Sequence, residues 1–239
     1  MSELLDNIFD TYGGRARWDE AHQISARQFF GGALWGMKGH PGALNDVDVT
    51  VDLHRQYVRQ EPFFEDGHHV TFTGDLVAVE DTEGNLVEEL RDPRASFAGH
   101  DLMTPWSRLQ LAYFSGSAMW TYLAEPLSLT FPGVRTEEIG TWTEDGEKFR
   151  RLHVVFPDSI ATLSTEQTLY VDGSGLIRRR DYSVAIAGDT PAAHYISGHQ
   201  EVSGLVIPTT RMIYSRDENG HKVPEPLVVS VHLENVTVS

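Results

Sequence analysis

The sequence predicts a β-dominated α+β fold in which a single curved antiparallel sheet carries a helix on its concave face. Strand-length segments that alternate apolar and polar residues recur along most of the chain. Short turns rich in Gly, Asp and Asn separate them. One long apolar segment with helical spacing, Thr104–Pro126, interrupts the strands near the middle of the chain. A parallel α/β fold would instead need a helix between successive strands.

The chain before this apolar segment combines a short helix with several strands. Residues 4–12 carry apolar side chains at helical spacing, and Gly13-Gly14 supplies a left-handed ending. Residues 23–35 are rich in aromatic side chains and predict a strand with a bulge at Gly31-Gly32. Val47–Leu53 alternates apolar with polar residues, as in a sheet with one solvated face. Further short strands are predicted over residues 57–61, 69–73, 76–80 and 86–90.

The chain after the apolar segment shows regular turn signals. Glu144-Asp145-Gly146, Asp172–Gly175 and Asp217–Gly220 each separate strand-length runs, and the last strand, Leu227–Glu234, alternates most cleanly. The whole chain then has about ten antiparallel strands, and a sheet of this size curls as its twist accumulates. Since no linker or repeat is visible, we expect a single domain over residues 1–239, a half-barrel with a helix in its hollow.

The central segment predicts a helix with two apolar faces. Thr104 is the expected N-cap, Pro105 suits the first helical position, and Pro126 prevents continuation. One face has Trp106, Leu109, Ala112, Tyr113, Gly116, Trp120 and Leu123, and the other has Leu111, Phe114, Ala118, Met119 and Tyr122. A helix that is apolar on two sides is covered on two sides. The second cover can be more of the protein, a partner or an apolar ligand, and ordinary core packing is the commonest case.

Composition narrows the classes of function. The chain has 239 residues and a formal net charge of −16, which argues against nucleic acid or an anionic membrane as the main partner. With no cysteine, it can form neither a disulfide nor a thiolate metal site. The N-terminus lacks a basic segment followed by an apolar run, and no run approaches the roughly 20 apolar residues of a membrane span. We therefore expect a cytoplasmic protein without membrane insertion, and an oligomer is compatible with the sequence.

Several segments resemble a known family. The opening YGGRARWDEAHQISA (Tyr12–Ala26) and the later strands Gly175–Val184, Ala192–Tyr214 and Ser230–Val238 resemble the LolA-like lipoprotein-carrier and outer-membrane-lipoprotein-sorting group. The block PWSRLQLAYFSGSAMWTYLAEP (Pro105–Pro126) is similar to that of uncharacterised soluble bacterial proteins. The resemblance implies an incomplete antiparallel barrel, closed on its concave side by helices, which in the carriers shelters acyl chains. From it we expect an apolar cavity between sheet and helix.

Charged residues in one predicted strand are candidates for the cavity wall. With Tyr182 on the apolar side of its strand, period-two alternation points Arg178 and Arg180 inward, and the opposite parity would point Arg179 inward. An inward Arg needs a carboxylate, because an unpaired buried charge is very costly. Protein carboxylates such as Glu166 or Glu201, or an acidic ligand, could supply it.

His100-Asp101 is a candidate for catalysis, because it lies just before the N-terminus of the predicted helix, where the dipole favours anions. The alternative is a turn in which Asp101 accepts backbone N–H groups. The eleven histidines do not indicate a metal site. His199 and Glu201 form a lone pair, and no HExxH spacing is present. We expect no metal and no cofactor.

These observations leave two hypotheses for function. The first is a protein that binds a small apolar or amphipathic molecule between the sheet and the helix, and an inward Arg would suit an acidic one. The second is a cofactor-independent lyase, isomerase, cyclase or hydrolase that acts on such a molecule by proton transfer. An enzyme should bring titratable groups with shifted pKa values together in the cavity, whereas a binding protein should have few and mutually satisfied polar groups. The predicted ligand-binding residues are Trp106, Gln110, Tyr113, Phe114, Ser117, Trp120, Arg178 and Arg180, and the predicted catalytic residues are His100 and Asp101.

Overall fold

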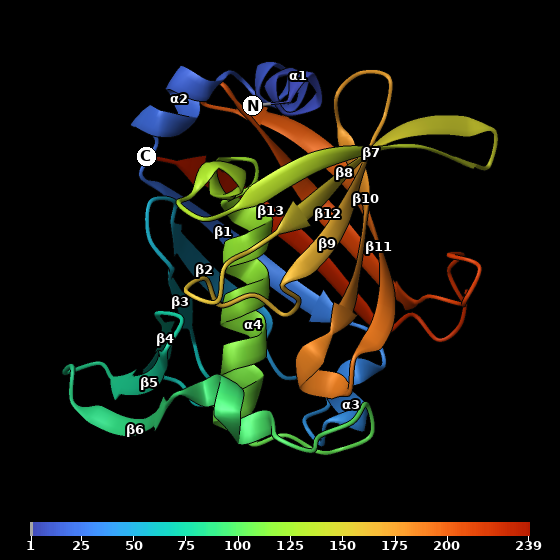
Figure 1. Ribbon diagram of the computed structural model, residues 1–239. Coiled ribbons are helices and arrows are strands. Elements are labelled where there is room, and N and C mark those ends of the chain that lie inside the picture. The colour runs from blue at the N-terminus through green and yellow to red at the C-terminus, as the bar shows by residue number, and fades with distance from the viewer. Residues whose placement is uncertain (1) are drawn as a thin grey trace.

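The computed structural model describes residues 2–239 and shows one antiparallel sheet that wraps around a central helix (Figure 1). Its thirteen strands follow the order β6-β5-β4-β3-β2-β1-β13-β12-β11-β10-β9-β8-β7. They are β1 (Gln23–Gly31), β2 (Asn45–Asp52), β3 (Tyr57–Glu61), β4 (His68–Phe72), β5 (Leu76–Asp81), β6 (Leu86–Arg91), β7 (Arg135–Glu144), β8 (Glu147–Val155), β9 (Glu166–Val171), β10 (Ile177–Val184), β11 (Thr190–Val202), β12 (Leu205–Ser215) and β13 (Val229–Val238).

The sheet consists of two meanders joined at one seam. Strands β1 to β6 pair in sequence order, as do β7 to β13, and β1 pairs with β13 between them. The edges of the sheet are therefore β6 and β7, and the sheet does not close. The prediction of a large curved antiparallel sheet is confirmed, but about ten strands was too few. At Ser203-Gly204 both residues have positive φ, 51° and 82°, as a tight hairpin turn requires, and this turn separates the long strands β11 and β12.

Seven helical segments accompany the sheet in the described part of the chain. They are α1 (Glu3–Thr11), α2 (Arg15–Glu20), α3 (Leu34–Met37), α4 (Arg108–Leu123) and the 3-10 turns η1 (Pro93–Phe97), η2 (Leu127–Thr130) and η3 (Ala185–Ala187). The strand predicted over residues 23–35 ends at Gly31. The chain turns from β1 towards α3 at Gly32, whose φ of 99° suits glycine. A Cβ at this position would also collide with the backbone of Val228. Among the helices of residues 2–239, none is long and apolar enough to span a membrane.

The central helix α4 begins three residues later than the sequence suggests. Its N-cap is Ser107, whose hydroxyl accepts the backbone N–H of Gln110 at 3.2 Å, while the Gln110 side chain accepts the backbone N–H of Ser107 at 2.9 Å. Thr104, the predicted N-cap, instead donates its hydroxyl to Asp101 at 2.8 Å. The prediction failed because Trp106, two residues inside the expected helix, donates its backbone N–H to Lys38.

Helix α4 lies inside the curled sheet and is buried along its whole length after Arg108 (Figure 1). One side packs against strands β2 to β5. There Gly116 lies against the ring of Phe72, and a Cβ at this position would come within 2.5 Å of Phe72. Trp120 donates its indole N–H to the carbonyl oxygens of Asp52 and Arg55 at 3.1 and 2.9 Å. The two apolar faces predicted for the helix are thus both covered by protein.

Candidate functional site

An apolar pocket separates the other side of α4 from strands β10 to β13. Its walls are mainly apolar and aromatic side chains from the helix, the sheet and the loop before α4. Six of them are Leu102, Phe114, Tyr122, Ala192, Ile213 and Val229. The helix residues among them belong to the predicted Phe114–Tyr122 face. The pocket therefore lies where a ligand was expected, between the sheet and the helix.

The pocket is much smaller than the sequence led us to expect. Its volume, measured as the space open to the centre of a water molecule, is about 40 Å³, and on this kind of measure one water molecule needs roughly 10 to 15 Å³. The hollow of the sheet is filled mainly by the protein's own side chains, since Trp18, Tyr113 and Trp120 are fully buried in the same core. Within residues 2–239, this pocket therefore takes a ligand larger than a few atoms only if side chains are displaced.

Charged residues lie on the same inner face as the pocket wall, each two positions along its strand from a pocket residue. Arg180 on β10 contacts the Glu125 carboxylate at 2.5 Å and the side-chain oxygen of Gln167 at 3.0 Å. Arg211 on β12 donates to the backbone carbonyl of Tyr122 at 2.9 Å and lies 3.4 Å from Nε2 of His194. We call Arg180, Arg211, His194 and Glu125 the inner charged cluster.

Burial changes the protonation of this cluster. Burial, reinforced by the nearby Arg180, lowers the pKa of the Arg211 guanidinium to about 10, so it remains charged at neutral pH. Burial and the two guanidinium groups hold the pKa of His194 well below its usual value, so this ring is neutral. Two guanidinium groups and one carboxylate leave one net positive charge inside the protein.

Two tyrosine rings stand between the pocket and the cluster. Tyr122 and Tyr182 line the apolar pocket, and both also line a void of about 10 Å³ that Arg180 borders. The ring of Tyr122 packs edge-on against His194 with 4.9 Å between centroids, and the Arg211 guanidinium lies 4.4 Å from the centre of the same ring. Burial raises the pKa values of both tyrosines, so both hydroxyls are protonated at neutral pH. These two rings therefore form the partition between the two spaces.

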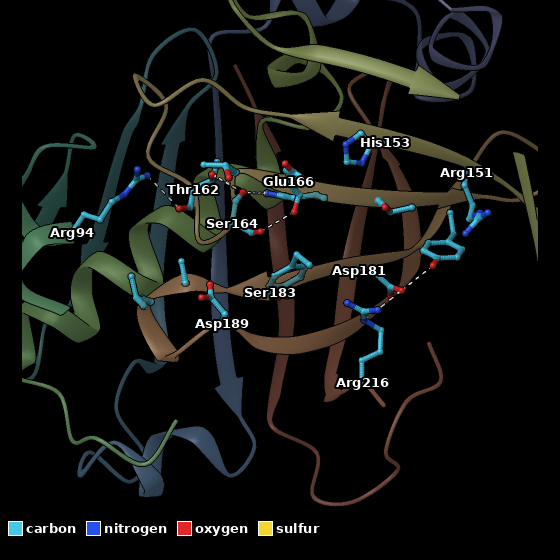
Figure 2. A pocket seen from close by; sticks show the side chains of 17 residues that line it. Arg94, Arg151, His153, Thr162, Ser164, Glu166, Asp181, Ser183, Asp189 and Arg216 are labelled. Atoms are coloured by element: carbon cyan, nitrogen blue, oxygen red, sulfur yellow. Dashed lines mark hydrogen bonds and ion pairs between the residues drawn. The ribbon is translucent and has the colours of Figure 1, made fainter. Parts of the chain in front are cut away.

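A larger hollow lies on the outer face of the sheet. This polar groove, about 620 Å³, crosses the outward residues of β8, β9 and β10, with Arg94 near one end and Arg151 and Arg216 near the other (Figure 2). The groove is open, and the buried one of its three carboxylates is already bonded, since Asp181 accepts hydrogen bonds from Tyr170 at 2.8 Å and from Arg179 at 2.7 Å. We therefore place the candidate site at the smaller apolar pocket, whose lining matches the expected ligand.

The predicted ligand-binding residues divide into two groups. Trp106 and Phe114 line the apolar pocket, and Arg180 borders the adjoining void. The others are used in contacts within the protein. Gln110 completes the helix cap and donates to Ser96, and Tyr113 accepts a hydrogen bond from Arg94. Ser117 donates to the carbonyl of Ala161, and Trp120 faces β2.

The inward orientation expected for Arg178 is wrong. Its side chain is 40% exposed and pairs with Asp172 at 2.6 Å. The reason is a register irregularity between Ile177 and Arg179, which breaks the period-two alternation at this end of β10. Arg179, in contrast, is buried, and it forms ion pairs with Asp181 and Glu144.

The His100-Asp101 pair forms a turn before α4. The Asp101 carboxylate accepts the backbone N–H groups of Met103 and Thr104, each at 2.9 Å. The hydrogen bond from the Thr104 hydroxyl and these two backbone bonds lower the pKa of Asp101. Lys38 donates to the backbone carbonyls of Asp101, Leu102 and Thr104 from the other side. Neither His100 nor Asp101 lines the apolar pocket. Geometry thus gives Asp101 a structural role and offers no support for catalysis by this pair.

Sequence reasoning missed Arg211 and His194. Each lies two residues along its strand from a pocket residue, since Arg211 precedes Ile213 and His194 follows Ala192. Side chains two apart in a strand share a face. The alternation Ile207, Thr209, Arg211, Ile213 could therefore have identified an inward guanidinium, had the β12 strand been traced along its whole length.

No family model matches this sequence, and no curated protein is similar enough in sequence to indicate a relationship. Many solved structures are similar in fold, among them the following three. A DUF1329 family protein from Desulfovibrio piger has a TM-score of 0.55 at 11% identity, with 98% of this chain and 91% of that chain covered. A LolA superfamily protein from Nitrosomonas europaea has a TM-score of 0.52 at 11% identity, with the same coverage.

The third structure is an outer-membrane lipoprotein-sorting protein domain from Vibrio parahaemolyticus. It has a TM-score of 0.53 at 8% identity, with 99% of this chain and 91% of that chain covered. At such low identity the similarity concerns the fold and not the activity. The chain has the LolA-like fold that the resemblance in its sequence implies.

Proposed function

We propose that this protein binds a small apolar or amphipathic molecule in the pocket between α4 and strands β10 to β13. The observation that carries the proposal is the lining of that pocket, in which aliphatic and aromatic side chains from the helix face a curved sheet. Ligand sites of this kind are concave and mainly apolar, with a few polar groups that fix orientation. Here those groups are the hydroxyls of Tyr122 and Tyr182 and the inner charged cluster behind them.

The pocket must widen before it can hold such a molecule. The segment that covers it, around Leu102, lies outside the helices and strands and is held by the hydrogen bonds of Lys38, and the neighbouring Met103 is 63% exposed. Loops of this kind open at lower free energy than the sheet that they cover. The similarity in fold to a lipoprotein-sorting domain supports the proposal of an apolar ligand. We propose that displacement of Leu102 and rotation of Phe114 admit the ligand.

Native mass spectrometry of the purified protein tests this proposal first, because a co-purified molecule would appear as a mass increment that can be released and identified. A titration with the neutral fluorescent probe N-phenyl-1-naphthylamine tests it independently. We expect saturable binding that the larger side chain of Ala192→Leu weakens at least about tenfold, since Ala192 lines the pocket.

The matched control is Ser197→Leu, because Ser197 lies on the same strand but is exposed. This variant should bind the probe as the unaltered protein does. If both variants bind equally, or if the probe does not bind in a saturable manner, the pocket is not a ligand site.

A second candidate is a cofactor-independent enzyme that acts on the bound molecule. It is favoured by one observation, the convergence of titratable groups with shifted pKa values in and beside the pocket, namely His194, Tyr122 and Tyr182. To test it, the molecule released from the protein would be incubated with the unaltered protein and with His194→Gln. Conversion by the unaltered protein alone would support catalysis. An unchanged molecule in both incubations would leave binding as the function.

A further inference from the structure

We infer that the inner charged cluster, with Arg211 at its centre, binds a carboxylate at the end of the ligand. This inference rests on the function proposed above and specifies the ligand as a fatty-acid-like molecule. Its tail would occupy the apolar pocket, and its acidic group would lie against Arg211, His194 and Arg180 once the Tyr122 ring turns aside.

The first argument is charge. Arg211 is 1% exposed and forms no ion pair within residues 2–239. The Glu125 carboxylate, which could neutralise it, is bonded to Arg180 at 2.5 Å. A buried guanidinium without its own counter-charge carries a large desolvation cost, and a well-packed apolar residue would be more stable in its place. One further negative charge at this position would neutralise the cluster.

The second argument is the kind of atoms left without partners. Because Arg211 must donate, Nε2 of His194 accepts, and the neutral ring then has its hydrogen on Nδ1. Within the described residues, Nδ1 of His194 and the Nε atoms of Arg180 and Arg211 have no hydrogen-bond partner. All three groups are donors in fully buried side chains. Three unsatisfied donors near one net positive charge are complementary to an anion that accepts hydrogen bonds.

The third argument is position. On the inner face, Arg180, His194 and Ile213 are neighbours across β10, β11 and β12, and Arg211 follows on β12. Ile213 lines the apolar pocket, so the cluster begins where the apolar lining ends. The Tyr122 ring lies against both His194 and Arg211 and also lines the pocket. Rotation of this one side chain would connect the two spaces.

The test compares ligands that share a tail and differ in the head. Displacement of N-phenyl-1-naphthylamine would be measured with dodecanoate, dodecyl phosphate and dodecanol at pH 7.5. Because hydrogen bonds to charged groups are stronger than neutral ones, we expect dodecanoate to bind about 10- to 100-fold more tightly than dodecanol. We expect dodecyl phosphate to bind more weakly than dodecanoate, because the space beside Arg180 is small.

Arg211→Met tests the residue itself. The apolar replacement removes an unneutralised buried charge, so the variant should fold and its melting temperature should not fall. It should lose the preference for dodecanoate and keep its affinity for dodecanol. The control is Arg178→Met, because Arg178 lies in the neighbouring strand region but is exposed and paired with Asp172. In addition, dodecanoate but not dodecanol should shift the ring resonances of His194 in NMR spectra.

Each other outcome has a defined meaning. If dodecanoate and dodecanol bind equally to the unaltered protein, the inference is wrong while the proposed function stands. If Arg211→Met loses both ligands alike, Arg211 only maintains the structure, and the inference is again wrong. If dodecyl phosphate binds best, the site takes a phosphate and not a carboxylate. If the probe itself does not bind, the proposed function has failed.

Discussion

The two sides of helix α4 face the two halves of the sheet and are built differently. Towards β2 to β5 the helix packs closely, with Gly116 against Phe72 and the Trp120 indole N–H bonded to the carbonyl oxygens of Asp52 and Arg55. Towards β10 to β13 it leaves the apolar pocket, and the inner charged cluster lies beyond it. The first side is explained by stability alone. The second side retains unsatisfied donors and a net charge, which are features that packing does not require.

The difference between the two sides shows which criterion locates a candidate site in a closely packed core. Pocket volume alone would select the outer polar groove, which is larger. Unpartnered nitrogens occur in both places, since Arg151 and Arg216 in the outer groove each have such an Nε. The inner side of the β10–β12 region differs because Arg180, His194 and Arg211 are almost completely buried. Natural proteins satisfy nearly all of their buried polar groups, so a cluster of exceptions indicates a site.

The largest effect should come from the carboxylate of the inner charged cluster. Glu125→Gln removes the ion-pair partner of Arg180 and the nearby negative charge that offsets Arg211, and should lower the free energy of unfolding by about 3 to 5 kcal/mol. Urea denaturation measures this loss. The control is Glu138→Gln, which removes a partly exposed pair with Arg150 and should cost less than about 1 kcal/mol. If both variants lost the same free energy of unfolding, the buried charges of the cluster would not need Glu125 for stability.

The closely packed side should respond next most strongly. Gly116→Ala places a methyl group within 2.5 Å of Phe72, and should destabilise the protein by about 1 to 3 kcal/mol. Thermal or urea unfolding would show it. Gly36→Ala is the matched control, since Gly36 lies in α3 with nothing near an added Cβ, and it should be neutral or slightly stabilising. An unaffected Gly116→Ala protein would mean that this side is looser than we describe.

Acid should lower the free energy of unfolding through His194, which lies beside the pocket. Burial, Arg211 and Arg180 keep His194 neutral in the folded protein, whereas the unfolded chain protonates it near pH 6.5. The stability that depends on this ring is present above pH 6.5 and is lost as pH falls. Between pH 7.5 and 5.5 the expected loss from His194 is about 1.4 kcal/mol. His199, whose pKa burial and Arg178 lower to about 4, adds to it in the same direction.

Urea denaturation of the unaltered protein and of His194→Gln at both pH values measures this contribution. The variant should show a smaller difference between the two pH values, because it lacks the titrating ring. An identical difference in both proteins would place the acid sensitivity elsewhere.

The smallest change in stability should come from the pocket wall. Phe114→Met keeps an apolar side chain of similar size but adds flexibility, and should cost less than about 1.5 kcal/mol. Because Phe114 lines the pocket, the same change should tighten binding of N-phenyl-1-naphthylamine. Phe72→Met on the packed side should leave probe binding unchanged, and a gain there would contradict the assignment of the pocket to one side of the helix.

The fold was predictable from the sequence because its signals are local. Alternation and turn residues locate most strands, and one apolar helical segment locates α4. The start of α4 was misplaced because Pro105 and Trp106 suit a helix in isolation, whereas the contact between Trp106 and Lys38 holds them in a loop. Such a contact between distant segments has no signal in a single sequence.

The site was predictable only in part. Trp106, Phe114 and Arg180 could be found by periodicity, but the register irregularity in β10 turned Arg178 outward. The extent to which side chains fill the hollow could not be foreseen, since it depends on three-dimensional packing. The same holds for the pairing of Glu125 with Arg180, because Glu125 follows α4 and lies 55 residues from its partner.

The seam between β1 and β13 has a consequence for how the molecule is assembled. β1 and β13, the first and the last strands along the chain, join the two halves of the sheet, so the halves cannot pair until β13 has been synthesised. Until then β1 and β12 are unpaired edges, which are prone to self-association. Such long-range pairing makes folding slow. A chaperone that shields these strands on the nascent chain would therefore raise the yield of native protein far more than it would change the stability of the finished fold.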